Sequence, residues 1–235
     1  MKKILLLVLV VFGLLIGNAD AKMLSYVPKN PTQALIVIHG YGQKGSSMGW
    51  MTENFRKSIP GMAIFYPTAP ERGPYGGYQW FAVPKMGEQI KDKELYDGMM
   101  KDALKNVQTL HDLVDEIHNK HQIPYQKIYV SGFSQGGLMA LLTALTSPRD
   151  ISIAISFSGV PLLFTPDFTT ASVKNIPNIL IMQGTNDWVI PKDSLRMTRE
   201  TLTELNIEPT MSLIPDMSHQ ISWKALKAAM DFIQQ

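Results

Sequence analysis

The chain of 235 residues contains no cysteine. Without a thiol it can form no disulfide bond and offers no cysteine to a metal ion or to a lipid group. A thiolate nucleophile is excluded for the same reason. We therefore expect any covalent chemistry that the protein performs to use an oxygen nucleophile.

An excess of charge of one sign is also lacking. The 22 basic and 20 acidic residues leave a net charge of +2, and neither sign forms a long block. Because nucleic acids attract basic runs, we expect no nucleic-acid partner. A chain of this size, 45% hydrophobic, buries one sizeable core but hardly two, so residues 22–235 are predicted to form a single domain.

The N-terminus carries the one long hydrophobic run, residues 4–16, directly after Lys2 and Lys3. Small residues at Ala19 and Ala21 follow it. This order is typical of an export signal, residues 1–21, cleaved after the second alanine. The run is shorter than the roughly 17 to 25 residues of a membrane span, so an uncleaved anchor is the less favoured alternative. We expect an exported bacterial protein, periplasmic or extracellular, with no stable membrane span after cleavage.

Short β-branched runs alternate with longer amphipathic segments along the rest of the chain. This alternation predicts an α/β protein with a mostly parallel central sheet and helices on both faces. The predicted strands are residues 34–38, 63–66, 127–131, 152–157, 178–183 and 210–215. The predicted helices are a long one with an apolar stripe over 103–117, and shorter ones at about 52–58, 135–146, 192–205 and 222–233.

Ser134 lies between Gly132 and Gly136, where a predicted strand gives way to a predicted helix. In a nucleophile elbow of this kind the serine takes a strained backbone conformation and its Oγ projects above the sheet. The flanking residues are glycines because larger side chains would clash. The alternative is a glycine-rich turn with a serine helix cap. We predict Ser134 to be the nucleophile.

A serine nucleophile needs a base, and the chain offers five histidines: His39, His111, His118, His121 and His219. Three of them lie on the long predicted helix, where a solvated surface is favoured over a metal pair at i, i+3. His39 precedes the serine in the chain. His219 follows the last predicted strand, in the order Ser, acid, His that this architecture takes, and is the predicted base.

The acid is expected between the serine and the histidine, at the end of a strand. Asp187 meets this requirement, just beyond the predicted strand 178–183. A surface turn residue before Pro191 is its alternative role. Asp216 is a weaker candidate, since it lies only three residues before His219.

An oxyanion hole is predicted where the first strand runs into the sequence HGYG. Gly40 and Gly42 let the backbone turn its N–H groups outward, although an ordinary glycine turn is the alternative. The predicted donors are the amides of Tyr41 and of Gln135, the residue after the nucleophile. Their side chains are expected to matter less than their backbone.

Residues 69–92 are rich in proline, glycine and aromatics and too long for an idle connection. Such a loop often forms a lid or a pocket wall. Tyr75, Tyr78, Trp80 and Phe81 are predicted to line an acyl pocket, the alternative being that they plug the loop onto the sheet.

Taken together, the chain resembles the phospholipase/carboxylesterase branch of the α/β-hydrolases, which also holds the acyl-protein thioesterases. The resemblance rests on IVIHGYG, YPTAP, QWF, VSGFSQGG, SFSGVP, QGTNDWVIP and MSH. It implies an α/β-hydrolase fold and the following roles: Ser134, Asp187 and His219 as the triad, Tyr41 and Gln135 as oxyanion donors, and Trp80 as part of the acyl-pocket wall.

The chain departs from the common family pattern at four positions. Gln43 and Ala82 stand where the family commonly has Asp, Gln183 where a His precedes GT, and Ser218 where Gly precedes the catalytic His. None of these changes removes a triad member. They alter the pocket, and together with the export signal they argue against carrying over the substrates of the intracellular thioesterases.

The predicted activity is hydrolysis of carboxylic ester or thioester bonds in small or lipid-like acyl substrates, through an acyl-enzyme. It needs no metal and no organic cofactor. One alternative is a peptidase or polymer esterase that uses the same triad, and another is a binding protein on the same scaffold. The sequence carries no prediction of oligomeric state.

Overall fold

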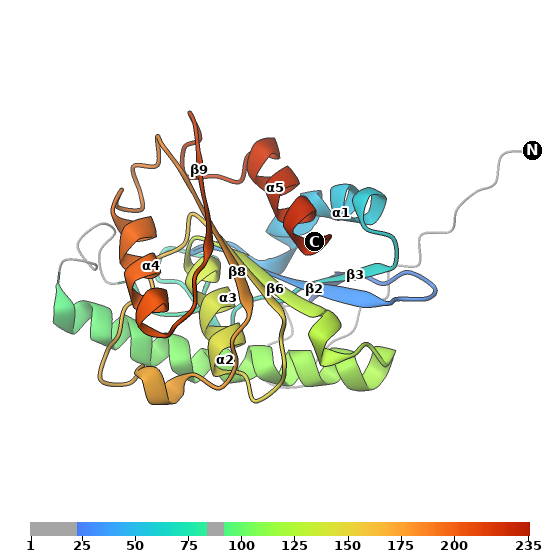
Figure 1. The fold of residues 1–235 in the computed structure, drawn as a ribbon, viewed down its shortest axis with the longest axis horizontal. Helices are drawn as coiled ribbons and strands as arrows, with labels where there is room; N and C mark the ends of the chain where they lie inside the picture. Colours follow the sequence, from blue (N-terminus) through green and yellow to red (C-terminus); the bar gives the residue numbers. More distant parts are fainter. Residues whose placement is uncertain (1–22, 84–91) are drawn as a thin grey trace, which may run out of the picture.

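A computed structural model describes residues 23–83 and 92–235 of the chain (Figure 1). The predicted export signal, residues 1–21, lies outside the described residues, and so does the stretch 84–91 of the aromatic segment. Over the two described ranges, no helix is long and apolar enough to cross a membrane.

A seven-stranded sheet forms the centre of the molecule, in the order β1-β3-β2-β6-β7-β8-β9. Its strands are β1 (Leu24–Tyr26), β2 (Gln33–Ile38), β3 (Met62–Tyr66), β6 (Ile128–Phe133), β7 (Ile153–Phe157), β8 (Asn178–Gly184) and β9 (Thr210–Ile214). All neighbours pair in parallel except β1, which runs antiparallel to β3. The mostly parallel sheet predicted from the sequence is thereby confirmed, with strand ends shifted by one or two residues.

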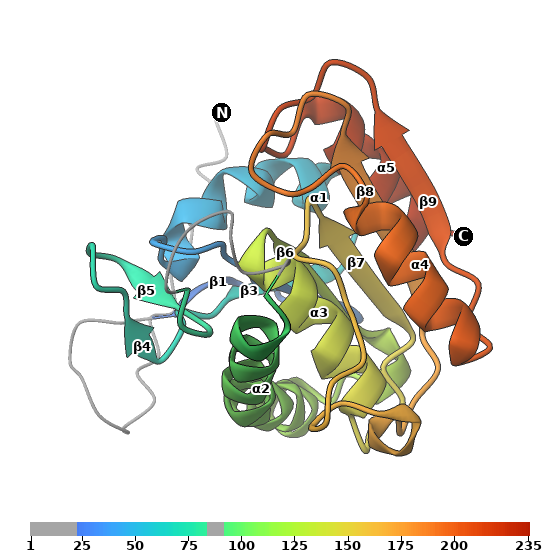
Figure 2. The ribbon, with the colours of Figure 1, turned by 90° about the vertical axis from the view of Figure 1, so that its left-hand side faces the viewer.

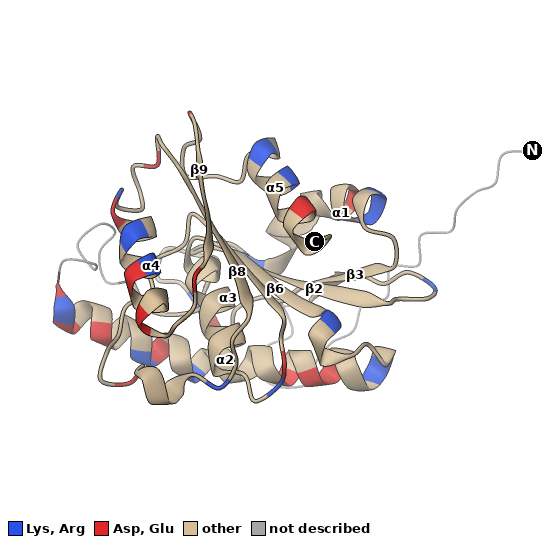
Figure 3. Ribbon diagram, in the orientation of Figure 1, with Lys and Arg blue, Asp and Glu red and all other residues tan. Residues whose placement is uncertain are grey.

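Helices cover both faces of this sheet (Figures 1 and 2). One face carries α2 (Lys93–His121), α3 (Gln135–Thr146) and α4 (Ser194–Glu204), and the other carries η1 (Gly45–Met51), α1 (Thr52–Ser58) and α5 (Trp223–Ile233). Short 3₁₀ turns, η2 (Tyr125–Lys127) and η3 (Thr170–Ser172), lie in the connections. Figure 3 shows the charged residues along the helices and loops rather than in the middle of the sheet.

The strand β2 shows why the sheet needs a helix layer on each side. Ala34, Ile36 and Ile38 belong to the core under α2 and α3, while Leu35 and Val37 belong to the core under α1 and α5. Successive side chains of a strand point to opposite faces, so a run of apolar residues is stable only where both faces are covered. Burial on both faces therefore places β2 in the interior of the sheet.

The long helix α2 has clear signals at both ends. The Asp92 carboxylate accepts hydrogen bonds from the amides of Glu94 and Leu95, which satisfies helix N–H groups that lack an intrahelical partner. At the other end Gln122 takes the left-handed conformation, φ 56°, and its amide donates to the carbonyl of His118. Between them the apolar stripe packs against α3 and the sheet.

The aromatic segment holds a small hairpin that the sequence did not predict. Its strands β4 (Glu71–Arg72) and β5 (Tyr78–Gln79) pair antiparallel. Tyr78 connects the hairpin to the loop after β2, since its carbonyl accepts a hydrogen bond from the amide of Gly42 and its amide donates to the carbonyl of Gln43.

The carboxyl ends of β2, β6 and β8 meet at the same edge of the central sheet. In open α/β sheets, ligands bind at this edge.

Candidate active site

The turn between β6 and α3 has the geometry of a nucleophile elbow. Ser134 has φ 56° and ψ −116°, a conformation that is strained for any residue with a side chain. A Cβ on Gly132 would lie 1.9 Å from the carbonyl oxygen of Gly136, and a Cβ on Gly136 would lie 2.1 Å from that of Ile38. Both glycines are therefore required by close backbone approach.

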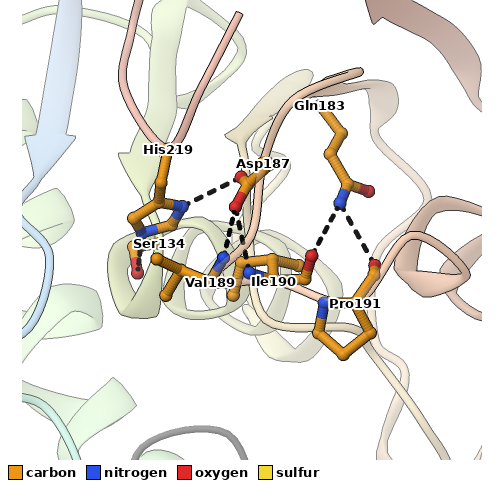
Figure 4. Close-up of polar contacts among 7 residues, drawn as sticks. All are labelled: Ser134, Gln183, Asp187, Val189, Ile190, Pro191 and His219. Atoms are coloured by element: carbon orange, nitrogen blue, oxygen red, sulfur yellow. Dashed lines mark hydrogen bonds and ion pairs between the residues drawn. The ribbon is translucent and has the colours of Figure 1, made fainter.

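The structure brings together the three side chains singled out from the sequence (Figure 4). His219 Nε2 lies 3.1 Å from Ser134 Oγ, and His219 Nδ1 lies 2.9 Å from Asp187 Oδ2. Each follows the end of a different strand, and the serine and the histidine are 85 positions apart in the chain. The alternative acid, Asp216, is exposed, and it is Asp187 that the imidazole contacts.

The carboxylate of Asp187 is held on both oxygens. Oδ1 accepts hydrogen bonds from the amides of Val189 and Ile190, both at 3.0 Å, and Oδ2 faces His219. Burial acts to raise the pKa of this carboxyl, but the hydrogen bonds from His219, Ile190 and Val189 outweigh it and hold the pKa below its ordinary value. An ionised carboxylate is thus kept beside the imidazole.

His39 supports the loop after β2 rather than the reacting groups. Its Nε2 accepts from the amide of Ala69 at 3.0 Å, so the ring proton lies on Nδ1, which donates to the carbonyl of Gly40 at 2.7 Å. Burial lowers the pKa of this imidazole to about 4, and the hydrogen bond to Gly40 opposes the shift only in part. His39 is therefore neutral and structural at ordinary pH.

This burial predicts an acid-sensitive stability. The pKa of His39 is about 4 in the folded protein and 6.5 in the unfolded chain, so below pH 6.5 the unfolded chain binds the extra proton. As the pH falls from about 7 to about 4, wild type should lose about 3 kcal/mol of unfolding free energy that a His39→Gln variant does not lose. Urea titrations of both proteins over this range measure it, and parallel pH profiles would contradict the assignment.

The two residues predicted to supply the oxyanion amides are Tyr41, in the loop after β2, and Gln135, directly after the nucleophile. The loop of Tyr41 is fixed on either side: the Gly40 amide donates to Gln43 Oε1 and the Gly42 amide to the carbonyl of Tyr78. A Cβ on Gly40 would lie 3.3 Å from Ser134 Cβ, so this loop passes directly beside the serine. Gln135 begins α3, where amides lack an intrahelical partner. The role of both amides stays a prediction.

The side chain of Gln135 has a structural role that sequence reasoning missed. It is 2% exposed, its Oε1 accepts from the amide of Trp80 at 3.1 Å, and its Nε2 donates to the carbonyl of Phe81 at 2.8 Å. Asn106, on α2, donates to the carbonyl of Trp80 at 2.7 Å. The elbow, the aromatic segment and α2 are thus tied together. The sequence signal was a glutamine in a mostly apolar helix, which indicates a buried polar group but not its partners.

Trp80 and Phe81 lie in the core, 1% and 0% exposed. The indole N–H of Trp80 donates to the carbonyl of His39 at 3.0 Å, and the ring centroids of Trp80 and His39 lie 5.4 Å apart. This packing matches the alternative in which the aromatics fix the segment onto the sheet, and it leaves their contribution to substrate binding a prediction. Tyr75, by contrast, is 87% exposed on the hairpin turn.

Comparison with known proteins agrees with this geometry. Residues 24–235 match the Phospholipase/Carboxylesterase family, so the chain belongs to that family. It is an enzyme of the serine hydrolase class with the α/β-hydrolase fold.

Individual relatives share little sequence identity with this chain, but the matches cover most of both chains. An acyl-protein thioesterase 1 from Debaryomyces hansenii is 28% identical over 221 residues, covering 87% of this chain and 91% of the relative. Esterase YpfH from Escherichia coli is 24% identical over 209 residues, covering 88% and 84%. The crystal structure of esterase PE8 superposes with a TM-score of 0.75 at 24% identity, covering 90% of this chain and 96% of the other.

Proposed function

We propose that the protein is an exported esterase that hydrolyses carboxylic ester or thioester bonds of small or lipid-like acyl substrates through Ser134, His219 and Asp187. The observation that carries the proposal is the continuous hydrogen-bonded chain from Asp187 Oδ2 to His219 Nδ1 and from His219 Nε2 to Ser134 Oγ. The names of the family and of its esterase and thioesterase relatives support the same bond type.

In the first half-reaction Ser134 Oγ attacks the carbonyl carbon while its proton passes to His219 Nε2. The developing oxyanion accepts hydrogen bonds from the amides of Tyr41 and Gln135. Asp187 stabilises the imidazolium and orients it. The bond to the leaving alcohol or thiol then breaks, and the leaving group takes the proton from His219, which leaves the acyl group on Ser134.

The second half-reaction repeats these steps with water. His219 removes a proton from a water molecule, whose oxygen adds to the acyl carbon, and the serine oxygen leaves with that proton. The side chain of His219 is 18% exposed, whereas that of Asp187 is 0% exposed. Water can therefore reach the base but not the carboxylate beside it. No metal or organic cofactor takes part.

Export is part of the proposal. It is supported by the two lysines, the apolar run over 4–16 and the small residues before position 22, and the family match begins only at residue 24. Mass spectrometry of the protein produced in a bacterial host should find Lys22 as the N-terminus in the periplasm or medium. A chain that keeps Met1 and stays with the membrane would support the anchor alternative instead.

The chain from Lys22, assayed with nitrophenyl esters from acetyl to palmitoyl, tests the reaction. We expect turnover of at least one ester, and the preferred chain length then sizes the pocket. A fluorophosphonate probe should modify Ser134, located by peptide mass spectrometry, because only an activated serine reacts. Labelling without ester turnover would favour a peptidase or polymer esterase. Absence of both would favour a binding protein on this scaffold.

A further inference from the structure

Gln183 is a buried glutamine that faces the loop after its own strand. It lies near the end of β8 and is 3% exposed. Its Nε2 lies 3.2 Å from the carbonyl oxygen of Ile190 and 3.1 Å from that of Pro191 (Figure 4). The side chain therefore reaches across the turn that carries Asp187.

The same turn supplies the hydrogen bonds to the Asp187 carboxylate. The amides of Val189 and Ile190 both donate to Oδ1 at 3.0 Å, which directs Oδ2 at His219. Ile190 is thus held from both sides: its N–H donates to Asp187 and its C=O accepts from Gln183 (Figure 4). A continuous path of hydrogen bonds runs from Gln183 through Ile190 and Asp187 to His219.

The amide group suits this place because one nitrogen carries two hydrogens. The single nitrogen can therefore donate one hydrogen bond to each of the two carbonyl oxygens. A hydrocarbon side chain would leave the two carbonyls without this donor, and buried carbonyls without partners are costly. A neutral histidine, the residue common here in the family that this chain resembles, offers only one N–H and could serve one carbonyl at most.

We propose that Gln183 is a positioning residue that fixes the loop of residues 187–191 and so aims the Asp187 carboxylate at the base. It touches neither substrate nor nucleophile and acts only through Ile190 and Pro191. The kinetic part of this inference rests on the proposed function. Its geometric part concerns the contact between Asp187 and His219 and can be measured without any substrate.

The test replaces Gln183 by leucine, which has a similar volume and no donor, and by histidine. With the ester that wild type prefers, Gln183→Leu should lower kcat about 10- to 100-fold and leave KM within about twofold, because misplacing a catalytic group affects the chemical step. Gln183→His should recover part of the loss. Asn175→Leu is the matched control: Asn175 Nδ2 also donates to two backbone carbonyls, those of Ala144 and Ile151, but near the amino end of β7, so the change should leave kcat unaltered.

The second readout is the proton NMR resonance of His219 Nδ1–H, which moves far downfield when a carboxylate accepts the bond and needs no turnover. It should be present in wild type and Asn175→Leu, shifted or lost in Gln183→Leu, and restored in part in Gln183→His. If Gln183→Leu fails to fold, Gln183→Asn, whose shorter side chain cannot reach the loop, replaces it.

The two readouts keep the two hypotheses apart. An unchanged kcat and an unchanged resonance in the leucine or asparagine variant would overturn the positioning role. So would a loss of unfolding free energy with no change in either readout, because that is the result of a purely structural residue. If wild type hydrolyses no ester, the proposed function fails, and the resonance alone then decides whether Gln183 positions Asp187.

Discussion

Replacing Ser134 by alanine is expected to lower kcat by about 10⁶-fold, the size of effect seen when a triad serine is removed. Without Oγ no acyl-enzyme forms, and the base has no proton to take. What remains is the contribution of the oxyanion amides and of binding, so a trace of rate above that in water should persist. Initial rates with the preferred nitrophenyl ester measure the loss, and the fluorophosphonate probe should no longer label the protein.

The Ser134→Ala substitution should leave the fold and its stability nearly unchanged. Ser134 Oγ makes its hydrogen bond to His219, and alanine keeps the Cβ that the strained turn already holds. We expect the unfolding free energy to change by less than about 1 kcal/mol. Ser158→Ala is the control, since Ser158 also has a positive φ, 44°, and its buried Oγ has no hydrogen-bond partner among the residues that the structure describes. Equal activity in wild type and Ser134→Ala would refute the assignment.

The elements most accurately predicted from the sequence are those that a strong local pattern determines. The strands β2, β7 and β8 are apolar at nearly every position, and only a sheet covered on both faces can bury such runs. The elbow was predictable because a Cβ on either of its two glycines would lie about 2 Å from a backbone carbonyl oxygen, which excludes every other residue type.

The missed elements depend on contacts between distant residues. Strand β1 has three half-buried residues and exists because it pairs with β3. Strands β4 and β5 have two residues each, too few to show a period. The side chain of Gln135 bonds to residues 54 and 55 positions away, so its role was visible only once the aromatic segment was placed. Its sequence motif indicated the backbone role alone.

Replacing Asp187 by asparagine is expected to lower kcat by about 10⁴-fold with little change in shape. The amides of Val189 and Ile190 can only donate, so the asparagine must turn its carbonyl oxygen toward them. Its NH₂ group then faces His219 Nδ1, which has to act as an acceptor. The imidazole proton is thereby moved to Nε2, the atom that faces Ser134 Oγ, and the base can no longer accept the serine proton.

Asp216→Asn is the matched control for this prediction, because it makes the same chemical change at the weaker candidate acid. Asp216 is exposed with φ 58°, a conformation that asparagine tolerates, so stability and rate should both stay near wild type. Measuring kcat/KM and the His219 Nδ1–H resonance in both variants decides the matter. A large loss of kcat/KM in Asp187→Asn alone would identify Asp187 as the catalytic acid. A loss of kcat/KM in Asp216→Asn alone would instead assign that role to Asp216 and show that the hydrogen bond between Asp187 and His219 does not serve catalysis.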